Sequence, residues 1–461
     1  MLDFLNRLAK KGKMRGVPTF LNRRVYLDYA ALTPPDVRVS REVAQTVQRY
    51  FANPSAIHAD GVQARKALAS ARSRVAKVLG AQADEVLFVA TGTEANNLAI
   101  FGLFKKLVMP KILGGFGLKP SDLHCLVSEI EHASVLESAR HLAEVGVNVE
   151  YVSIDASGRI DVAELRKKLR PNTFLVSVMS ANNEIGTIQP VDEVAKAVRK
   201  ARKENVLAGM VTGAVGETGH AASAPMFPLL HCDASQSPLY MKLSTPGFGA
   251  DMITLDSHKV CGPRSVGVLW VRRGIELMSI LYGGGQEHGV RSGTENVPGV
   301  TGMAKALELA EGLREREVER LTELRSYFIV RAQEMIAEKA SHVKMFLNGS
   351  SNVDALHQSP HIVSFSFEKT EGMIDHEFLL LKLDARGVAC STKSACLRDE
   401  DESYVIRALR RAQAAAIANG TLSAATVPST PHALRFSFGR WTTKREIDRA
   451  LTALVESLRS I

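Results

Sequence analysis

Residues 252–263 read Met-Ile-Thr-Leu-Asp-Ser-His-Lys-Val-Cys-Gly-Pro, and this stretch decides the fold. Its first five residues, 252–256, form an apolar run of strand length, and Gly262-Pro263 is a turn signal. Lys259 lies between the two, directly after the predicted strand. Parallel α/β sheets present their reactive side chains at this position, at the carboxyl ends of strands. A lysine alone is ordinarily a surface residue, so its meaning depends on the rest of the chain.

Similar apolar runs recur along the first part of the chain, and stretches with helical periodicity separate most of them. The predicted strands cover residues 24–29, 85–90, 123–127, 149–154, 173–179, 229–232, 252–256 and 267–271. The predicted helices cover 37–50, 59–79, 162–169 and 191–203, another starts at Glu94, and Asp161 is the expected N-cap of the helix at 162. Strands that alternate with helices form βαβ units, so we expect an α/β fold with a mostly parallel sheet.

The pattern changes near residue 302, where a second domain is expected to begin. A long charged helix is predicted over 300–338, followed by a strand at 362–367, a helix at 373–385 and a strand at 434–438. We therefore expect a basic extension at 1–24, a large domain at 25–301 whose first residues pack on the small domain, and a small α+β domain at 302–461. Two stretches of small, turn-prone residues, 206–228 and 412–431, are expected to be insertions in the form of loops or frayed helices.

The positive charge of the chain is concentrated at its start. The formal net charge is +9, and residues 1–24 hold seven Lys and Arg against the single acid Asp3, so the rest carries only +3. A weak field of this kind argues against direct nucleic-acid binding. The basic segment resembles a mitochondrial transit peptide in composition but lacks enrichment in Ser, so a cytoplasmic location is the main expectation and a mitochondrial one the alternative.

Composition excludes several other classes. A hydrophobic content of 45% argues against disorder, and no apolar run approaches the roughly 20 residues of a membrane span. The five cysteines are scattered, with no CxxC pair and no Cys/His ligand spacing, which argues against a disulfide framework or a metal site. A reducing compartment and at least one free thiol fit this pattern.

Two further segments give Lys259 a chemical context. Asp233 ends an apolar strand, where its carboxylate suits a protonated pyridine nitrogen, and Gln236 follows three residues later. That pairing is the main electronic task of a protein that binds pyridoxal phosphate, whose aldehyde condenses with a lysine. Taken alone, Asp233 is equally explained as a helix cap.

A phosphate site and a ring contact are also expected. Thr91-Gly92-Thr93 precedes a helix, and backbone N–H groups at a helix N-terminus bind phosphate. The motif is weak by itself, because Gly and Thr often only cap helices. His132 follows another predicted strand and suits stacking on the ring or proton transfer, although a lone histidine is more often structural.

Four collinear motifs resemble the cysteine desulfurases. They are Glu131-His132, Asn182-Asn183-Glu184-Ile185-Gly186, His258-Lys259 and the glycine-rich run 283–294. The resemblance extends from residue 26 to the C-terminus apart from the two insertions. It implies the fold-type I architecture of the class V aminotransferase superfamily, with a mostly parallel seven-stranded sheet and a smaller C-terminal domain.

The resemblance also implies a role for each matching residue. Lys259 would carry pyridoxal 5′-phosphate as a Schiff base, Asp233 would pair with the pyridine nitrogen, Gln236 would contact the phenolic oxygen, and His132 would stack on the ring and shuttle protons. The residues implied for the phosphate are Gly92, Thr93, Ser257 and His258, with Thr294 from the partner subunit of a homodimer. Asn183 and Arg435 would bind the substrate carboxylate, and Asn183 would also contact the cofactor.

The implied nucleophile is Cys396. Its context, Ser391-Thr392-Lys393-Ser394-Ala395-Cys396, resembles the Ser-Ser-Gly-Ser-Ala-Cys loop of the subgroup with a long cysteine loop. A thiolate on such a loop can visit the cofactor and leave carrying sulfur, and Lys393 and Arg398 favour the thiolate form. Cys125, Cys232, Cys261 and Cys390 are expected to be buried, unreactive residues.

Two positions depart from the family pattern. Asp256 stands where the family has a serine that contacts phosphate, so this contact is expected only if the carboxylate points away or Ser257 substitutes for it. Thr392-Lys393 replaces Ser-Gly in the cysteine loop, with acidic residues after it. These changes affect cofactor binding or the choice of sulfur acceptor rather than the nucleophile.

The resemblance therefore implies that L-cysteine becomes L-alanine while a persulfide forms on Cys396. The sulfur would pass to a protein of iron-sulfur cluster assembly or to a tRNA-thiolating enzyme, and the sequence does not distinguish the two. The alternatives are another class V reaction, such as selenocysteine cleavage or transamination, and a degenerate non-catalytic partner protein.

Overall fold

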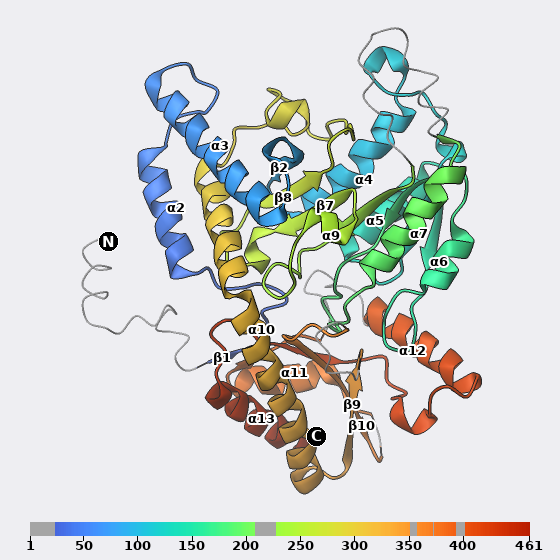
Figure 1. Ribbon diagram of the computed structural model, residues 1–461. Coiled ribbons are helices and arrows are strands. Elements are labelled where there is room, and N and C mark those ends of the chain that lie inside the picture. Colours follow the sequence, from blue (N-terminus) through green and yellow to red (C-terminus); the bar gives the residue numbers. More distant parts are fainter. Residues whose placement is uncertain (1–23, 208–226, 351–356, 372, 393–401) are drawn as a thin grey trace.

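The computed structural model describes residues 24–207, 227–350, 357–371, 373–392 and 402–461. It consists of a large unit built on a twisted sheet and a smaller unit below it in Figure 1. The first described strand, β1 (Val25–Tyr26), pairs in parallel with β11 (Val388–Ala389), so the start of the described chain packs on the smaller unit.

Among the described residues, seven strands form the large sheet in the order β2-β8-β7-β6-β5-β3-β4. Their bounds are β2 Val86–Val89, β3 His124–Ser128, β4 Asn148–Val152, β5 Thr173–Ser177, β6 Leu229–Asp233, β7 Met252–Asp256 and β8 Gly267–Val271. Of these seven strands, β8 alone runs in the direction opposite to the other six. The mostly parallel seven-stranded sheet confirms the expected fold class.

Helices cover both faces of this sheet, because alternate side chains of each strand point to opposite sides. In β2, Val86 and Phe88 belong to the apolar cluster on one face, while Leu87 and Val89 belong to the cluster on the other. The first face is covered by α3 (Ala59–Leu79), α6 (Val162–Lys168), α7 (Val191–Ala201) and the start of α10 (Val297–Lys339). The second is covered by α4 (Gly92–Val108) and α5 (Ala133–Glu144). Burial on both faces explains why the strands are continuous apolar runs.

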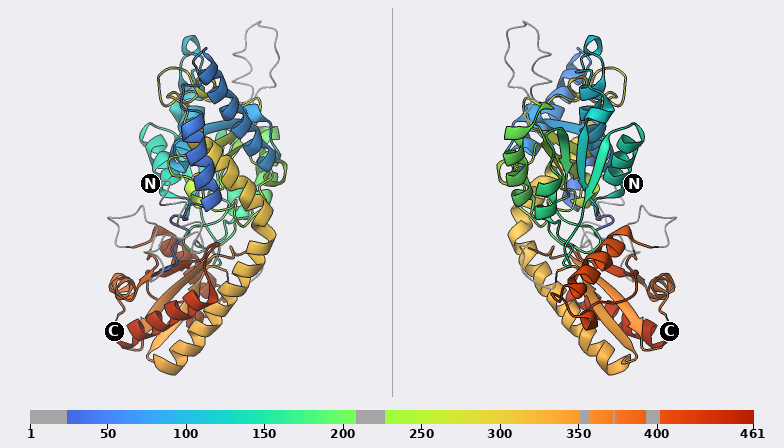
Figure 2. Two further views of the ribbon diagram at one scale, coloured as in Figure 1. Left: turned by 90° about the vertical axis from the view of Figure 1, so that its left-hand side faces the viewer. Right: turned by 90° about the vertical axis from the view of Figure 1, so that its right-hand side faces the viewer.

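Helix α10 links the two units, and the side views in Figure 2 show it running along one side of the molecule from the large unit into the small one. The domain boundary proposed at residue 302 lies inside this helix. In the small unit, β9 (Val343–Asn348), β10 (Ile362–Lys369) and β12 (Leu434–Ser437) form an antiparallel sheet. Helices α11 (His376–Ala385) and α13 (Lys444–Arg459) complete the layers of the small unit, while α2 (Val37–Arg49) packs on the start of α10 beside α3 in the large unit.

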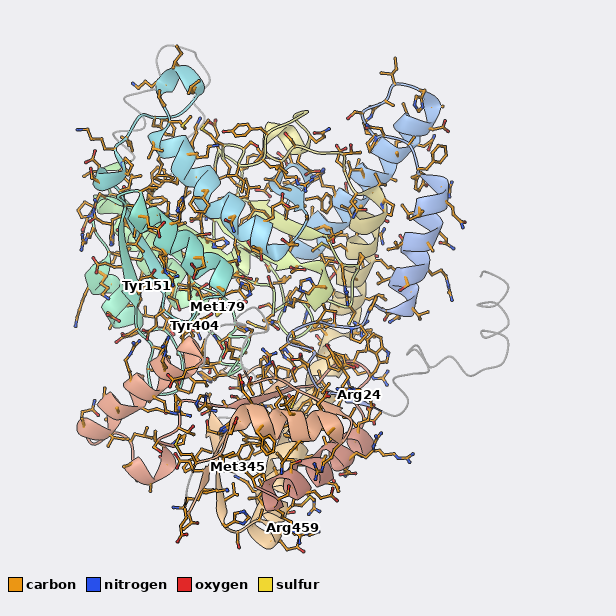
Figure 3. All side chains as sticks on the ribbon, turned by 180° about the vertical axis from the view of Figure 1, so that it is seen from behind. Arg24, Tyr151, Met179, Met345, Tyr404 and Arg459 are labelled. Carbon is orange, nitrogen blue, oxygen red and sulfur yellow. The ribbon has the colours of Figure 1, made fainter. Side chains whose placement is uncertain are left out.

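Helix α12 (Tyr404–Ala418) extends from the small unit toward the large one. Its Tyr404 hydroxyl donates a hydrogen bond to the carbonyl of Glu131, and Figure 3 shows Tyr404 near Met179 where the units meet. In the stretch 412–431, expected to be loops or frayed helices, residues 412–418 form the end of α12. Most of the other predicted insertion, 206–228, lies outside the described residues.

Within the described ranges, no helix combines the length and the apolar character needed to cross a membrane.

Candidate active site

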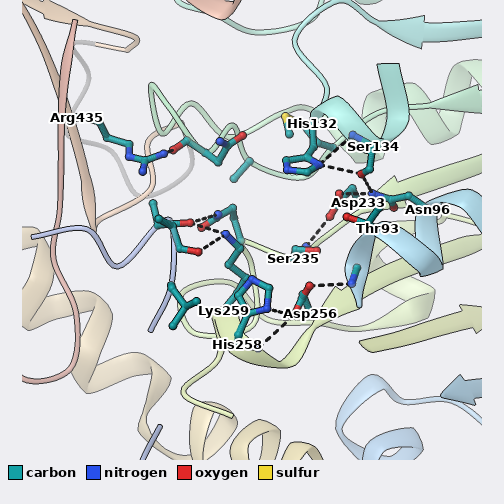
Figure 4. Close-up of a pocket in the computed structure, with 18 residues that line it drawn as sticks. Thr93, Asn96, His132, Ser134, Asp233, Ser235, Asp256, His258, Lys259 and Arg435 are labelled. Carbon is teal, nitrogen blue, oxygen red and sulfur yellow. Dashed lines mark hydrogen bonds and ion pairs between the residues drawn. The ribbon is translucent and has the colours of Figure 1, made fainter. Parts of the chain in front are cut away.

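A cavity of about 280 Å³ opens at the carboxyl ends of the parallel strands, beside the junction of the two units (Figure 4). This edge is where α/β sheets commonly bind ligands. The lining residues are Ala30, Ala31, Leu32, Gly92, Thr93, Asn96, His132, Ser134, Met179, Ala181, Asn183, Asp233, Ser235, Gln236, Asp256, His258, Lys259 and Arg435.

Lys259 projects into the cavity from a short turn that follows β7. Its Nζ donates hydrogen bonds to the carbonyls of Ala30 and Ala31, both at 2.8 Å. Gln236 Nε2 donates to the same Ala30 carbonyl at 2.9 Å. The segment before α2 therefore forms one wall of the cavity and orients the lysine amine.

A chain of hydrogen bonds lies on the far side of the cavity from Arg435. Asp233, at the end of β6, accepts from Asn96 Nδ2 at 2.8 Å and from the backbone N–H of Ser235 at 3.0 Å. Asn96 Nδ2 also donates to Ser134 Oγ at 2.8 Å, and Ser134 Oγ lies 2.8 Å from His132 Nδ1. Three elements, β6, α4 and α5, thus hold one polar network.

The hydrogen bonds of His132 assign its proton. Its Nδ1 accepts from the backbone N–H of Ser134 at 3.2 Å, because His132 is the N-cap of α5. The neutral ring therefore carries its proton on Nε2. This orientation leaves Nε2 as the nitrogen able to exchange a proton with a ligand.

Two anion-binding groups meet at the N-terminus of α4. The backbone N–H of Gly92 donates to Asp256 Oδ2 at 2.7 Å, and His258 Nδ1 lies 2.6 Å from Asp256 Oδ1. Burial alone would raise the pKa of Asp256, but the hydrogen bonds from His258 and Gly92 hold it below its ordinary value. The carboxylate does not point away from the predicted phosphate cup: it lies inside it.

Arg435 on β12 faces the opposite end of the cavity, and only 2% of the residue is exposed. Its Nη1 donates to the carbonyl of Asn183 at 2.9 Å, and its Nη2 pairs with Asp28 at 2.7 Å. Within the described part of the chain, its buried Nε has no hydrogen-bond partner. An arginine with a spare donor suits a carboxylate ligand.

Glu131 lies fully buried directly before His132. Its Oε1 accepts from the backbone N–H of Met179 at 2.7 Å, and its Oε2 has no partner among the described residues. Burial raises the pKa of Glu131 well above its usual range, and the nearby Asp233 adds to the effect. Burial therefore favours the uncharged form of Glu131.

Comparison with known proteins identifies the family to which the chain belongs. The family model of class-V aminotransferases matches residues 25–222 and 215–450. The cysteine desulfurase IscS of Dictyoglomus turgidum is 35% identical over 445 residues, covering 96% of this chain and 97% of that protein. Cysteine desulfurase IscS 1 of Archaeoglobus fulgidus is 33% identical, covering 95% and 98%. The chain is a class-V aminotransferase of the cysteine desulfurase family.

Solved structures agree with this membership. A NifS-like protein superposes on this chain with a TM-score of 0.76 at 28% identity. The match covers 95% of this chain and 100% of the NifS-like protein. SspA, solved in complex with cysteine, gives a TM-score of 0.62 at 27% identity, over 89% and 98%. The resemblance inferred from the four sequence motifs is therefore confirmed.

Most of the predicted site residues of this desulfurase line one cavity. They are Gly92, Thr93, His132, Asn183, Asp233, Gln236, His258, Lys259 and Arg435. Ser257 is not among them, because it is fully buried and its Oγ lies against Gly262. Thr294 is exposed and outside the cavity of its own chain, and Cys396 lies outside the described residues.

The sequence prediction missed several residues of the cavity, above all Asn96 and Ser134. Asn96 lies four residues after Gly92 in α4, a spacing that puts both on one face of a helix and provides a usable signal. Ser134 has a weaker signal as the second residue after His132. Residues 30–32 have none, because their contact with Lys259 is a product of the tertiary fold.

Proposed function

We propose that this desulfurase uses pyridoxal 5′-phosphate to convert L-cysteine to L-alanine, and that Cys396 receives the sulfur. In the overall step the carbon–sulfur bond of the substrate breaks, a sulfur–sulfur bond forms on Cys396, and the substrate carbon gains a proton. One observation carries the proposal: an amine on Lys259 and a buried carboxylate on Asp233 share a cavity with the guanidinium of Arg435. SspA, a structural relative, was solved with cysteine, which supports this substrate.

The donor set of the cavity fits the cofactor. Lys259 supplies a primary amine for its aldehyde, and Asp233 supplies a carboxylate, itself held by Asn96, for a protonated ring nitrogen. His132 and Gln236 lie in the same cavity and suit the ring face and the phenolic oxygen. At the phosphate end, Thr93 and His258 line the cavity, but His258 is paired with Asp256, which is the one group of the wrong charge. When bound, the cofactor withdraws electrons from the bonds around the α-carbon of the substrate.

Arg435 and Asn183 would bind and orient the substrate. The planar guanidinium matches a carboxylate in a bidentate manner, and the unpaired Nε of Arg435 gives it a donor for this purpose. Asp28 holds the outer edge of the same guanidinium, which fixes its plane. The amino acid is thereby oriented with its α-carbon toward Lys259.

Lys259 and His132 would move protons. The Lys259 amine is positioned by the carbonyls of Ala30 and Ala31 and would transfer the α-proton of the substrate. His132 presents the Nε2 proton of its neutral form and would donate or accept at the same face. Both groups act from the walls of one enclosed site.

The chain segment that leads to Cys396 is anchored at the site through Ser391. Ser391 exchanges two backbone hydrogen bonds with Arg435, from N to O at 3.1 Å and in the reverse direction at 2.6 Å. Cys396 follows five residues later, and an extended chain of five residues spans at most about 17 Å. The five residues from Ser391 are therefore long enough for Cys396 to reach the cavity.

Three further parts of the proposal concern partners and place. The exposed Thr294 would complete the phosphate site of a second copy in a homodimer. The sulfur would pass to a protein of iron-sulfur cluster assembly or of tRNA thiolation, in keeping with the IscS relatives. A cytoplasmic location is proposed over a mitochondrial one.

The activity test incubates the purified protein with pyridoxal 5′-phosphate, L-cysteine and a reductant, and measures alanine and sulfide together. Equal amounts of the two are expected. Cys396→Ala should keep the visible absorbance of the cofactor and lose alanine formation, while the matched control Cys390→Ala should keep both. Lys259→Ala should lose the absorbance of the internal lysine linkage. Undiminished alanine from Cys396→Ala would refute the role of Cys396.

Mixing variants tests the homodimer. Lys259→Ala and Thr294→Ala subunits are unfolded together, refolded as mixed dimers and titrated with cofactor. If Thr294 serves the neighbouring cavity, one of the two sites in each mixed dimer regains wild-type affinity. Absence of that high-affinity class would place Thr294 outside the cofactor site.

A further inference from the structure

Asp256 lies where a bound phosphate would need positive or neutral donors. Its carboxylate is 6% exposed, at the N-terminus of the 17-residue helix α4 and in the same cavity as Lys259. Oδ2 accepts from Gly92 N at 2.7 Å, and Oδ1 accepts from His258 N at 3.2 Å and lies 2.6 Å from His258 Nδ1. Three donors that suit a phosphate oxygen are thus already in use.

Gly92 makes room for this carboxylate. A Cβ at position 92 would lie 3.0 Å from Asp256 Oδ2, 3.2 Å from Asp256 Cβ and 3.4 Å from Ser235 Oγ. These contacts are tighter than a side chain ordinarily accepts. The absence of a side chain at position 92 therefore allows the carboxylate of Asp256 to lie this close to the N-terminus of α4.

The electrostatics follow from this geometry. A helix N-terminus with free N–H groups attracts anions, and here the chain supplies the anion itself. The charge of Asp256 is stabilised by His258 and by the helix, so the carboxylate is ionised at neutral pH. A phosphate that enters the cup meets a like charge at close range and finds the Gly92 N–H occupied.

We propose that Asp256 is an internal anion that competes with the phosphate of the cofactor for the N-terminus of α4, and that it sets the affinity of the protein for pyridoxal 5′-phosphate. The inference rests on the proposed function, because it concerns the cofactor assigned there. Its consequence is that the phosphate adds little to the affinity of the wild-type protein. The aldehyde and ring contacts of Lys259 and Asp233 then carry most of the binding.

The test measures the affinities of pyridoxal 5′-phosphate and of pyridoxal, which lacks the phosphate, by titration of cofactor absorbance at fixed pH. Asp256→Ser should bind the phosphorylated form about tenfold more tightly than wild type, while its affinity for pyridoxal changes by less than about threefold. Inorganic phosphate should compete with the cofactor more strongly in Asp256→Ser than in wild type. Asp256→Asn keeps the shape of the side chain without its charge. It should also raise the affinity for pyridoxal 5′-phosphate relative to the affinity for pyridoxal.

The close contact between positions 92 and 256 can be tested independently. Gly92→Ala should lower the melting temperature of the wild-type protein more than that of Asp256→Ser, because serine leaves the space that the carboxylate fills. This comparison does not depend on cofactor binding and remains informative if a single variant folds poorly.

Each outcome distinguishes this inference from the proposed function. Unchanged or weaker binding of pyridoxal 5′-phosphate by both Asp256 variants would overturn the competition and make Asp256 an organiser of the cup. If the wild-type protein binds neither pyridoxal form, the proposed function fails and this inference with it. If both forms bind and Lys259→Ala abolishes the absorbance, an unaltered affinity ratio in the Asp256 variants refutes only the inference.

Discussion

At the scale of single residues, the site depends on buried polar groups that are bonded in a fixed order. Asp233 is placed by Asn96, Asn96 also reaches Ser134, and Ser134 fixes the ring of His132. Each group is buried or half-buried, where an unmade hydrogen bond is costly. The network therefore stabilises the fold and at the same time orients Asp233 and His132 in the cavity.

Replacement of Asn96 should expose this dependence. Asn96→Ala removes the donor to Asp233 Oδ2, leaves only the Ser235 N–H bond to Oδ1, and should lower the free energy of unfolding by about 1–3 kcal/mol. The matched control is Asn97→Ala, since Asn97 is half-buried and its Nδ2 donates to the carbonyl of Thr93 in its own helix rather than to the network. It should change stability by less than about 0.5 kcal/mol. Urea unfolding of both variants measures the difference, and equal effects would contradict the network.

Glu131 allows a prediction about charge. Because burial raises the pKa of Glu131 and favours its uncharged form, Glu131→Gln should keep the hydrogen bond to Met179 N–H and cost less than about 1 kcal/mol at pH 7, whereas Glu131→Ala should cost about 1–3 kcal/mol. A raised pKa in the folded state means that the stabilisation by glutamate is complete below its unfolded pKa and is lost as pH rises. Glu131→Gln should therefore become more stable relative to wild type as the pH rises above the unfolded pKa of glutamate. A pH series of urea unfolding checks the sign, and the opposite trend would mean that Glu131 is ionised.

At the scale of helices and strands, the sequence predicts what local patterns encode. The strands of the large sheet are continuous apolar runs, and Asp161 caps α6 through Ala163 and Glu164 as expected. Strand β9 was missed because its burial does not alternate and it follows directly on a long helix. The sequence analysis predicts no helix at 404–411, where α12 begins, and allows a frayed helix only from residue 412, although the alanines of α12 favour helix.

In the candidate site, too, local sequence patterns predict some residues and miss others. Lys259, Asp233 and Gly92 were predictable because each directly follows or ends a strand, and such ends meet at one edge of a parallel sheet. The wall formed by residues 30–32 was not, since these residues are more than 200 positions from the lysine that they bind. The hydrogen bond from Gly92 to Asp256 depends on a similar long-range approach.

Helix α12 begins at a cap that also joins the two units. Ser403 Oγ accepts from Ile406 N at 3.2 Å and donates to Glu184 Oε2 at 2.6 Å, in the loop that carries Asn183. Ser403→Ala should cost about 2 kcal/mol, from a lost N-cap and a lost hydrogen bond to a buried carboxylate. The control Ser423→Ala removes an exposed cap of a short turn and should cost less than about 0.5 kcal/mol. Hydrogen exchange of the first turn of α12 reports the loss directly, and unchanged protection would contradict the role of the cap.

At the scale of the whole molecule, the segment before α2 connects the two units. Asp36 caps α2 through Arg38 N at 2.9 Å and pairs with Arg440 of the small unit at 2.6 Å. Upstream of it, Asp28 pairs with Arg435, and Ala30 and Ala31 contact Lys259. One short stretch of chain thus contacts Lys259, Arg435 and Arg440 and links the large unit to the small one.

The pair formed by Asp36 and Arg440 gives a prediction about pH. Burial alone would raise the pKa of Asp36, but the bonds from Arg38 and Arg440 lower it to about 2. A lowered pKa in the folded state means that the stabilisation is complete above the unfolded pKa and is lost as pH falls toward 2. Asp36→Asn should therefore cost about 3 kcal/mol at pH 7, and the difference from wild type should shrink between about pH 4 and pH 2.

The chain offers its own probes for this measurement, because its two tryptophans lie in different units: Trp270 in β8 and Trp441 beside Arg440. Urea unfolding in Trp270→Phe and Trp441→Phe backgrounds follows the small and the large unit separately. The Asp36→Asn change should lower both midpoints if the pair joins the units into one cooperative structure. The control Asp84→Asn, which breaks an exposed pair with Arg273, should lower neither by more than about 0.5 kcal/mol. A loss confined to the Trp441 signal would mean that the large unit folds independently of this link and that the proposed domain boundary is also a boundary of stability.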